Sequence, residues 1–195
     1  MTDYAIGRER RRVARPNGWW GMAVFVASEA TLFGTIFGSY FYLRFNSPHW
    51  PPHGIEAPKV VVPLVLTGVL VATSVPMQLA FFAARAARIG LAWLFVFVSL
   101  VVQCGYFAMQ IHLFLSDLDK FQPSGSAYAS IYFTMLGAHH FHVFVGMLLN
   151  LWLLARLAGG LTNYRLIALQ TTTFYWHFVN VLALCVVGAQ LSAAV

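Results

Sequence analysis

The feature that most constrains this chain is a series of five long apolar runs that contain almost no charged residues. Each run has 25 to 27 residues, and a helix needs about 20 residues to cross the hydrocarbon core of a bilayer. Lipid cannot hydrogen-bond an open backbone and the runs lack the alternating pattern of a membrane β-barrel, so helices are expected. Hydrophobic residues make up 59% of the chain and charged residues 9%, which excludes a soluble domain. The predicted fold is an all-α membrane protein, a single domain over residues 1–195, with a basic tail at 1–17 and a bundle of five transmembrane helices near 18–43, 60–84, 89–115, 129–155 and 166–191.

Arginine and lysine residues flank these runs unevenly. Nine lie on the side of the N-terminal tail and three lie on the opposite side. By the positive-inside rule, this asymmetry predicts a cytoplasmic N-terminus and an external C-terminus. Topology therefore accounts for the net charge of +6, and we expect no nucleic-acid partner. Four arginines border the short inner loops and are candidates for binding phospholipid headgroups, although topology alone explains them equally well: Arg85, Arg88, Arg156 and Arg165.

Glu29 lies near the middle of the first run, which is otherwise uncharged. A carboxylate at this depth is costly, so it is expected to face protein or water and to have a partner. Other polar residues fall at comparable depth in the last two runs, counting 1.5 Å per helical residue. His139 and His142 are three residues apart and share a helix face, as do His177 and Asn180. These five residues are the candidate functional residues of the chain.

Three interpretations of this polar band are open from the residues alone. Histidine is the most common metal ligand, and His142 with His177 would supply one axial pair for a haem. A carboxylate and histidines are also the raw material of a proton path. The third interpretation is structural, because a buried carboxyl group hydrogen-bonded to histidine would hold helices in register. Cys104 and Cys185 both fall inside apolar runs, and we expect neither a disulfide nor a thiolate metal site from them.

Three sequence motifs resemble one known family. Residues 20–44 read WGMAVFVASEATLFGTIFGSYFYLR, which is similar to the glutamate-bearing helix of subunit III of haem–copper cytochrome c oxidases. Residues 127–146 read AYASIYFTMLGAHHFHVFVG, and His139 and His142 fall on the two histidines of the corresponding family helix. Residues 175–187 begin YWHFVN and are similar to the family's last helix. The motifs occur in the family's order and extend over nearly the whole chain.

The resemblance implies a bundle of transmembrane helices docked on the catalytic subunit I of a terminal oxidase. The chain corresponds to the five-helix bacterial form, which lacks the first two helices of the longer subunits. In this family subunit III holds no metal and transfers no electrons, so haem and copper are expected in partner subunits. It stabilises subunit I during turnover and binds phospholipid. The implied partners are subunit I directly, subunit II and further respiratory subunits, in the bacterial cell membrane.

Two departures from the family pattern change the expected chemistry. Asn180 replaces an aspartate, which keeps hydrogen bonding but removes a titrating group, and His140 replaces a glycine and adds a donor at a helix contact. Glu29 is expected to pair with His139 or His142. The motifs favour the cytochrome c branch over subunit III of a quinol oxidase or a relative associated with nitric-oxide reductase. An independent proton channel or transporter is the alternative from another class.

Overall fold

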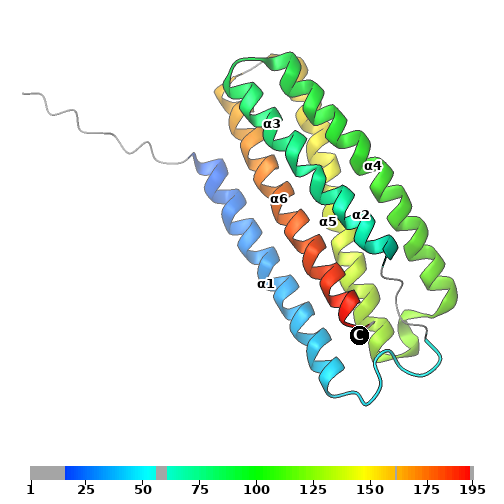
Figure 1. The fold of residues 1–195 in the computed structure, drawn as a ribbon. Helices are drawn as coiled ribbons and strands as arrows, with labels where there is room; N and C mark the ends of the chain where they lie inside the picture. The colour runs from blue at the N-terminus through cyan, green and yellow to red at the C-terminus, as the bar shows by residue number, and fades with distance from the viewer. Residues whose placement is uncertain (1–15, 56–60, 161, 194–195) are drawn as a thin grey trace, which may run out of the picture.

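The computed structural model describes residues 16–55, 61–160 and 162–193, and most of the predicted basic tail lies outside this part of the chain. Five helical stretches in it are long and apolar enough to cross a membrane, as predicted. They run antiparallel to one another along the sequence (Figure 1). The all-α membrane fold is thereby confirmed, with helices α1 (Asn17–Phe45), α2 (Val61–Ala72), α3 (Ser74–Arg85), α4 (Ile89–Lys120), α5 (Ala127–Ala158) and α6 (Asn163–Ser192), and a 3₁₀ turn η1 (Pro123–Gly125).

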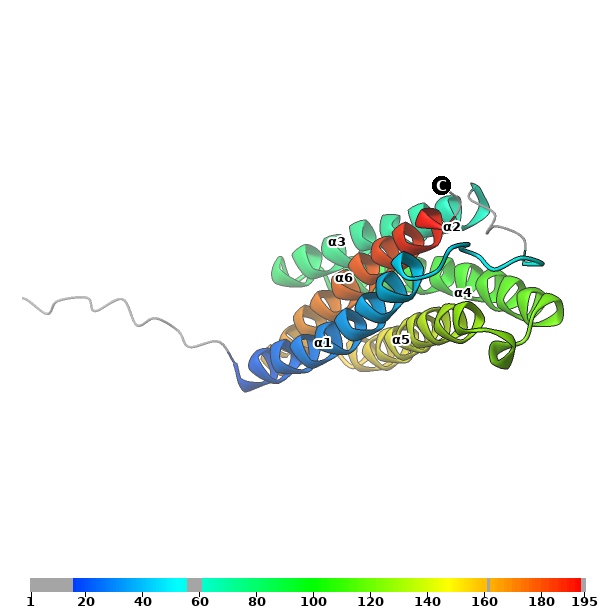
Figure 2. The same ribbon diagram turned by 90° about the horizontal axis from the view of Figure 1, so that it is seen from below.

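Helix α6 lies at the centre of the packing and α1 lies at its edge. The α6 helix contacts α1, α2, α3 and α5, whereas the main contacts of α1 are with α5 and α6 (Figures 1 and 2). One polar tie secures the far end of α1, where the Tyr40 hydroxyl donates to the carbonyl oxygen of Ala189 on α6 at 2.8 Å. Of α1, Phe33, Ile36 and Tyr40 are buried, so apolar packing of a few side chains and a few polar contacts attach this helix to the bundle.

The second transmembrane span is broken where its sequence carries a proline. Pro76 has no N–H group, so the carbonyl of Ala72 loses its usual helical donor. The helix is interrupted at Thr73, which separates α2 from α3. Both the backbone N–H and the hydroxyl of Thr73 turn back to the carbonyl oxygen of Leu70, at 3.0 and 2.5 Å. The two helical pieces together form one span, Val61–Arg85.

Helix α4 is longer than its apolar run. The predicted span ends at Leu115, but the helix continues to Lys120. Within its last turn, the Lys120 ammonium group lies 2.9 Å from a carboxylate oxygen of Asp117. The chain then reverses through η1, and the Ser126 hydroxyl caps α5 by accepting from the N–H of Ala129 at 3.1 Å. The polar residues after Leu115 therefore extend α4 beyond the apolar run.

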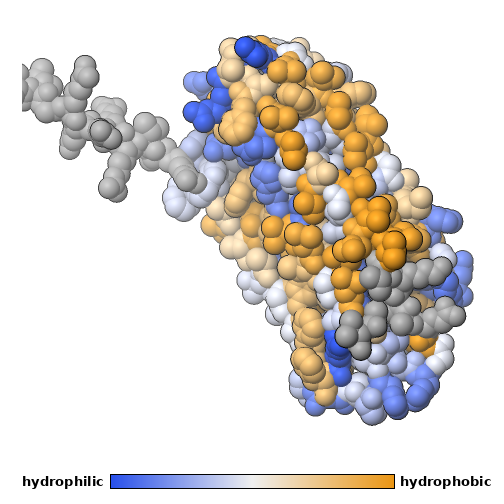
Figure 3. Space-filling view, in the orientation of Figure 1, coloured by the Kyte–Doolittle hydropathy of each residue, from blue (hydrophilic) through white to orange (hydrophobic). Residues whose placement is uncertain are grey.

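The outer surface matches a bilayer environment. Figure 3 shows hydrophobic side chains over much of one face, with hydrophilic residues gathered mainly toward the two ends. Exposed apolar side chains occur on every one of the five spans. On α1 the surface also includes glycines, because a Cβ built on either Gly34 or Gly38 would meet no other atom within 4 Å in the described residues.

Candidate functional site

Glu29 on α1 meets His142 on α5. The Oε2 atom of Glu29 lies 2.9 Å from Nε2 of His142. The other ring nitrogen, Nδ1, lies 2.7 Å from the carbonyl oxygen of Ala138. A carbonyl oxygen only accepts, so Nδ1 carries a hydrogen and donates it. The side chain of Glu29 is 19% exposed and that of His142 is 7% exposed, which places the contact at the partly open edge between the two helices. Of the two expected partners, Glu29 thus contacts His142.

The backbone of His142 also contacts a third helix. The Tyr175 hydroxyl on α6 donates to the carbonyl oxygen of His142 at 3.0 Å. The ring of Phe33 on α1 packs edge-on against the imidazole, with 5.2 Å between the ring centroids. Helices α1, α5 and α6 therefore meet at His142. Its imidazole contacts both Glu29 and Phe33 of α1.

His139 faces a different helix. Its Nε2 atom lies 3.4 Å from the hydroxyl of Tyr106 on α4, and Gln110 donates to the same hydroxyl at 3.1 Å. The neighbouring His140 packs edge-on against Phe114, also on α4, with 5.4 Å between ring centroids. Although His139 and His142 lie on the same side of α5, His139 therefore contacts α4 and His142 contacts α1.

His177 and Asn180 join α6 to α3. The two ring nitrogens of His177 lie 3.2 Å from the Ser74 hydroxyl and 3.2 Å from the amide oxygen of Gln78. The Asn180 amide donates to the same Ser74 hydroxyl at 2.5 Å. Both residues are therefore separated from Glu29, and His177 and His142 have different protein partners. The haem interpretation required these two histidines to face one another, and this arrangement does not supply that pair.

Trp176 secures the break in the second span. Its indole N–H donates to the hydroxyl of Thr73 at 2.8 Å, and both side chains are buried. The ring lies so close to α5 that a Cβ added at Gly146 would come within 2.6 Å of it. Glycine at this position thus permits the close approach of α5 and α6. In the YWHFVN motif, Tyr175 contacts α5, and Trp176, His177 and Asn180 contact the broken span.

A further series of hydrogen-bonded polar side chains, which was not predicted from the sequence, links α5, α4 and the break in the second span. Asn150 on α5 donates to the amide oxygen of Gln103 on α4 at 2.8 Å, and Gln103 donates to the Ser99 hydroxyl at 2.7 Å. Ser99 in turn donates to the carbonyl oxygen of Thr73 at 3.4 Å. Asn150, Gln103 and Ser99 have no exposed surface. The available signal was that each is an isolated polar residue within an apolar run.

The four candidate lipid-binding arginines gather at one end of the bundle. Arg85 and Arg88 border the α3–α4 turn, and Arg156 and Arg165 border the α5–α6 turn, at the end where α1 begins (Figure 1). Arg85, Arg88 and Arg156 are exposed. Arg165 is half-buried and its guanidinium donates to the carbonyl oxygen of Gly160, so part of its donor capacity is used within its own turn.

The described residues hold no group of three or more histidine, cysteine, aspartate or glutamate side chains that could bind a metal ion. Cys104 and Cys185 are exposed and unbonded. His49 and His53 lie close together in the segment after α1, with 4.1 Å between their ring centroids, and both are exposed. The expectation that this chain holds no cofactor of its own remains a prediction.

Comparison with known proteins identifies a family over almost the whole chain. The family model for cytochrome c oxidase subunit III matches residues 7–187. The chain is 28% identical to subunit 3 of the cytochrome bo(3) ubiquinol oxidase of Pseudomonas aeruginosa, over 87% of this chain and 82% of that protein. It is 30% identical to a probable cytochrome c oxidase subunit 3 of Nocardia farcinica, over 83% and 80%. Subunit 3 of the Bacillus subtilis cytochrome c oxidase is 26% identical, over 85% and 81%.

Proposed function

The chain belongs to the family of cytochrome c oxidase subunit III, and on this premise we propose that it is the non-redox accessory subunit of a haem–copper terminal oxidase in a bacterial cell membrane. It docks on the catalytic subunit I and keeps that subunit stable during turnover. Haem and copper belong to partner subunits, and the reaction of the whole complex is oxidation of cytochrome c with proton translocation. This chain supplies no catalytic centre.

One observation carries the proposal beyond family membership. Each of the five candidate residues contacts a side chain on a helix other than its own. Glu29 joins α1 to α5, His139 joins α5 to α4, and His177 and Asn180 join α6 to α3. Polar side chains inside a membrane protein that bond across helices fix the arrangement of those helices. This pattern favours the structural interpretation, in which the polar band maintains the bundle in the shape that its partner requires.

The arginine cluster supports a second part of the proposal. With a cytoplasmic N-terminus, Arg85, Arg88 and Arg156 are exposed at the inner surface, where anionic headgroups attract basic residues. We assign them to phospholipid binding, with Arg165 contributing less because it also bonds to its own turn. Replacing Arg85 and Arg88 by glutamine should reduce the anionic phospholipid that remains with the purified complex, as measured by mass spectrometry. Unchanged lipid content would leave these residues with a topological role only.

The central experiment is purification of the oxidase through a tag on this chain. We expect haem–copper subunit I to copurify, with haem absorption in the complex and none in the isolated chain. A copper-containing subunit II that accepts electrons from cytochrome c would identify the electron donor. Purification of this chain alone would contradict the proposal, and proton flux through the isolated chain in liposomes would favour the channel alternative.

A quinol oxidase is the second candidate function. The similarity to the Pseudomonas aeruginosa subunit, whose name specifies a ubiquinol oxidase, is the observation that favours it. The same purified complex separates the two candidates, because a quinol oxidase would reduce oxygen with ubiquinol and would not accept electrons from reduced cytochrome c.

A further inference from the structure

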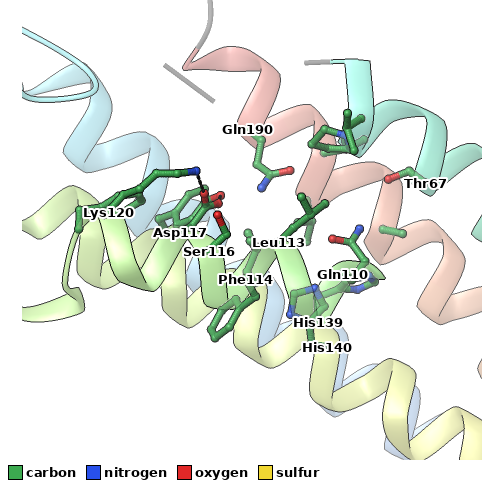
Figure 4. A pocket seen from close by; sticks show the side chains of 18 of the residues that line it. Thr67, Gln110, Leu113, Phe114, Ser116, Asp117, Lys120, His139, His140 and Gln190 are labelled. Carbon is green, nitrogen blue, oxygen red and sulfur yellow. Dashed lines mark hydrogen bonds and ion pairs between the residues drawn. The ribbon is translucent and has the colours of Figure 1, made fainter. Parts of the chain in front are cut away.

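A cavity of about 620 Å³ lies inside the bundle, apart from the Glu29–His142 contact. Side chains of α2, α4, α5 and α6 line it, and its lining runs from the end of the bundle that holds Asp117 and Lys120 to the middle of α5 (Figure 4). The cavity therefore has one end near the surface, at Asp117 and Lys120, and one deep end inside the bundle. The side chains at the two ends indicate what occupies it.

At the deep end are His139 and His140, which are adjacent on α5. Both side chains are more than nine-tenths buried, and both line the cavity (Figure 4). The Nδ1 atom of each ring is buried without a hydrogen-bond partner among the described residues. A buried polar atom in a native protein nearly always has a partner, either protein or ordered water. Two such atoms on the lining of one cavity indicate that its occupant can form hydrogen bonds.

The chemistry around His139 shows which kind of partner is needed. Gln110 donates to the Tyr106 hydroxyl, so the hydroxyl hydrogen is free to be donated to Nε2 of His139. A neutral imidazole that accepts at Nε2 carries its hydrogen at Nδ1. The Nδ1 atom of His139 is then a donor directed to an acceptor that the described protein does not provide.

The wall between the two ends is also partly polar. Tyr132 and Gln190 line it together with apolar side chains such as Leu113 and Leu136. At the polar end, the Tyr132 hydroxyl donates to Asp117 at 2.8 Å, beside the ion pair of Asp117 with Lys120. A lipid chain could not supply hydrogen bonds to the unpaired Nδ1 atoms of His139 and His140. At a share of about 30 Å³ per molecule, the volume has room for about 20 waters.

We propose that this cavity is a hydrated vestibule, which opens at the Asp117–Lys120 end and brings water to Nδ1 of His139 and His140 within the membrane. Water both donates and accepts, so it satisfies either tautomer of each ring. The vestibule gives protons and small hydrophilic solutes access to these two histidines from one end of the bundle. The Glu29–His142 contact lies outside it, since neither residue lines the cavity.

The test is cysteine accessibility in the assembled oxidase, in membranes opened to reagent on both sides. In a background with Cys104 and Cys185 replaced by alanine, single cysteines are placed at three cavity positions: Leu113, Leu136 and Val186. Leu115 and Leu184 are matched controls, because each lies two residues from a cavity position on the same helix and is exposed, at 54% and 52%, without lining the cavity. The probe is a permanently charged methanethiosulfonate, which reacts with cysteine in water.

We expect the charged reagent to modify L113C and V186C at least about tenfold faster than L115C and L184C, because thiolate forms and reacts in water. Only complexes that retain their haem spectrum are scored, and three cavity positions on three helices ensure that one failed variant does not decide the result. Labelling of the cavity cysteines by an uncharged maleimide but not by the charged reagent would show an apolar occupant and overturn the proposal. Protection of all three from both reagents would overturn it as well.

Discussion

Glu29 on α1 and His142 on α5 are joined by one hydrogen bond. Because Nδ1 of His142 donates to the carbonyl oxygen of Ala138, its hydrogen is fixed there. The 2.9 Å contact between Nε2 and Glu29 Oε2 then needs one hydrogen, which belongs either to the carboxyl group or to the imidazole. The pair is neutral overall in both cases. This neutrality explains how an acid is tolerated at the membrane-facing edge of α1, where an unpaired charge would be costly.

Substitution of Glu29 should distinguish hydrogen bonding from charge. In E29Q the side-chain amide can donate to Nε2 of His142, so we expect the complex to retain this subunit and its thermal stability. In E29A the imidazole loses its partner, at a cost of about 1–3 kcal/mol for a buried group. The effect should fall toward the lower end because Glu29 is 19% exposed and Tyr40 still ties α1 to Ala189. For both variants, the measurement is the amount of this subunit that remains in the complex after heating to increasing temperatures.

The control for this comparison is Thr35→Ala on the same helix. The Thr35 hydroxyl is exposed and, among the described residues, donates only to the carbonyl oxygen of Leu32 in its own helix, so the substitution should leave subunit retention unchanged. If E29A behaved like T35A in both thermal stability and sustained turnover, Glu29 would have no role in holding α1.

Gly146 should not tolerate a methyl group. A Cβ at this position would lie 2.6 Å from the Trp176 ring, which is fixed by its bond to Thr73. Overpacking of a buried helix contact typically costs about 1–3 kcal/mol. We expect G146A to lower the melting temperature of the complex and the yield of the subunit. A Cβ at Gly137 on the same helix would meet no atom within 4 Å in the part of the chain that the structure describes, so G137A should be neutral. Equal stability of the two variants would contradict the close approach of α5 and α6.

The positions of the spans could be predicted because they depend on the length of apolar runs alone. Each predicted run lies inside an observed span, apart from a single residue, Val60, which lies outside the described residues. The end of α4 was predicted wrongly, since Ser116–Lys120 is polar enough to resemble a loop. A last-turn ion pair and the bond from Tyr132 to Asp117 accompany the helical continuation there. Such contacts depend on the neighbouring helix, which hydrophobicity does not reveal.

The rotation of each helix decided which polar residues meet. His139 and His142 are separated by about 60° around α5, which is enough for one to face α4 and the other α1. The sequence limits the partner of Glu29 to two residues, but it does not determine the rotation of α5 that would choose between them. The same limitation hid the contact of His177 with α3, because it requires knowledge of which helix lies beside α6.

The Asn150–Gln103 bond should show strong coupling between its partners. Both side chains are fully buried, so Q103L or N150L alone leaves a polar group unsatisfied, at a cost of about 1–3 kcal/mol. The double variant Q103L/N150L removes both groups and should be less destabilised than the sum of the single variants. The melting temperatures of the unmodified complex, the two single variants and the double variant give the four values of this double-mutant cycle. Additive effects would show that the two amides do not interact.

The predicted orientation can be tested at two exposed, uncharged positions at opposite ends of α4. Ala86 precedes this helix in the α3–α4 turn, and Ser124 follows it in η1. With Cys104 and Cys185 replaced by alanine, we expect a membrane-impermeant maleimide to modify S124C on intact spheroplasts. A86C should react only after the membrane is opened, because the turn with Arg85 and Arg88 is predicted to be cytoplasmic. The reverse pattern would place the N-terminus outside and would remove the basis for assigning the arginine cluster to inner-leaflet lipid.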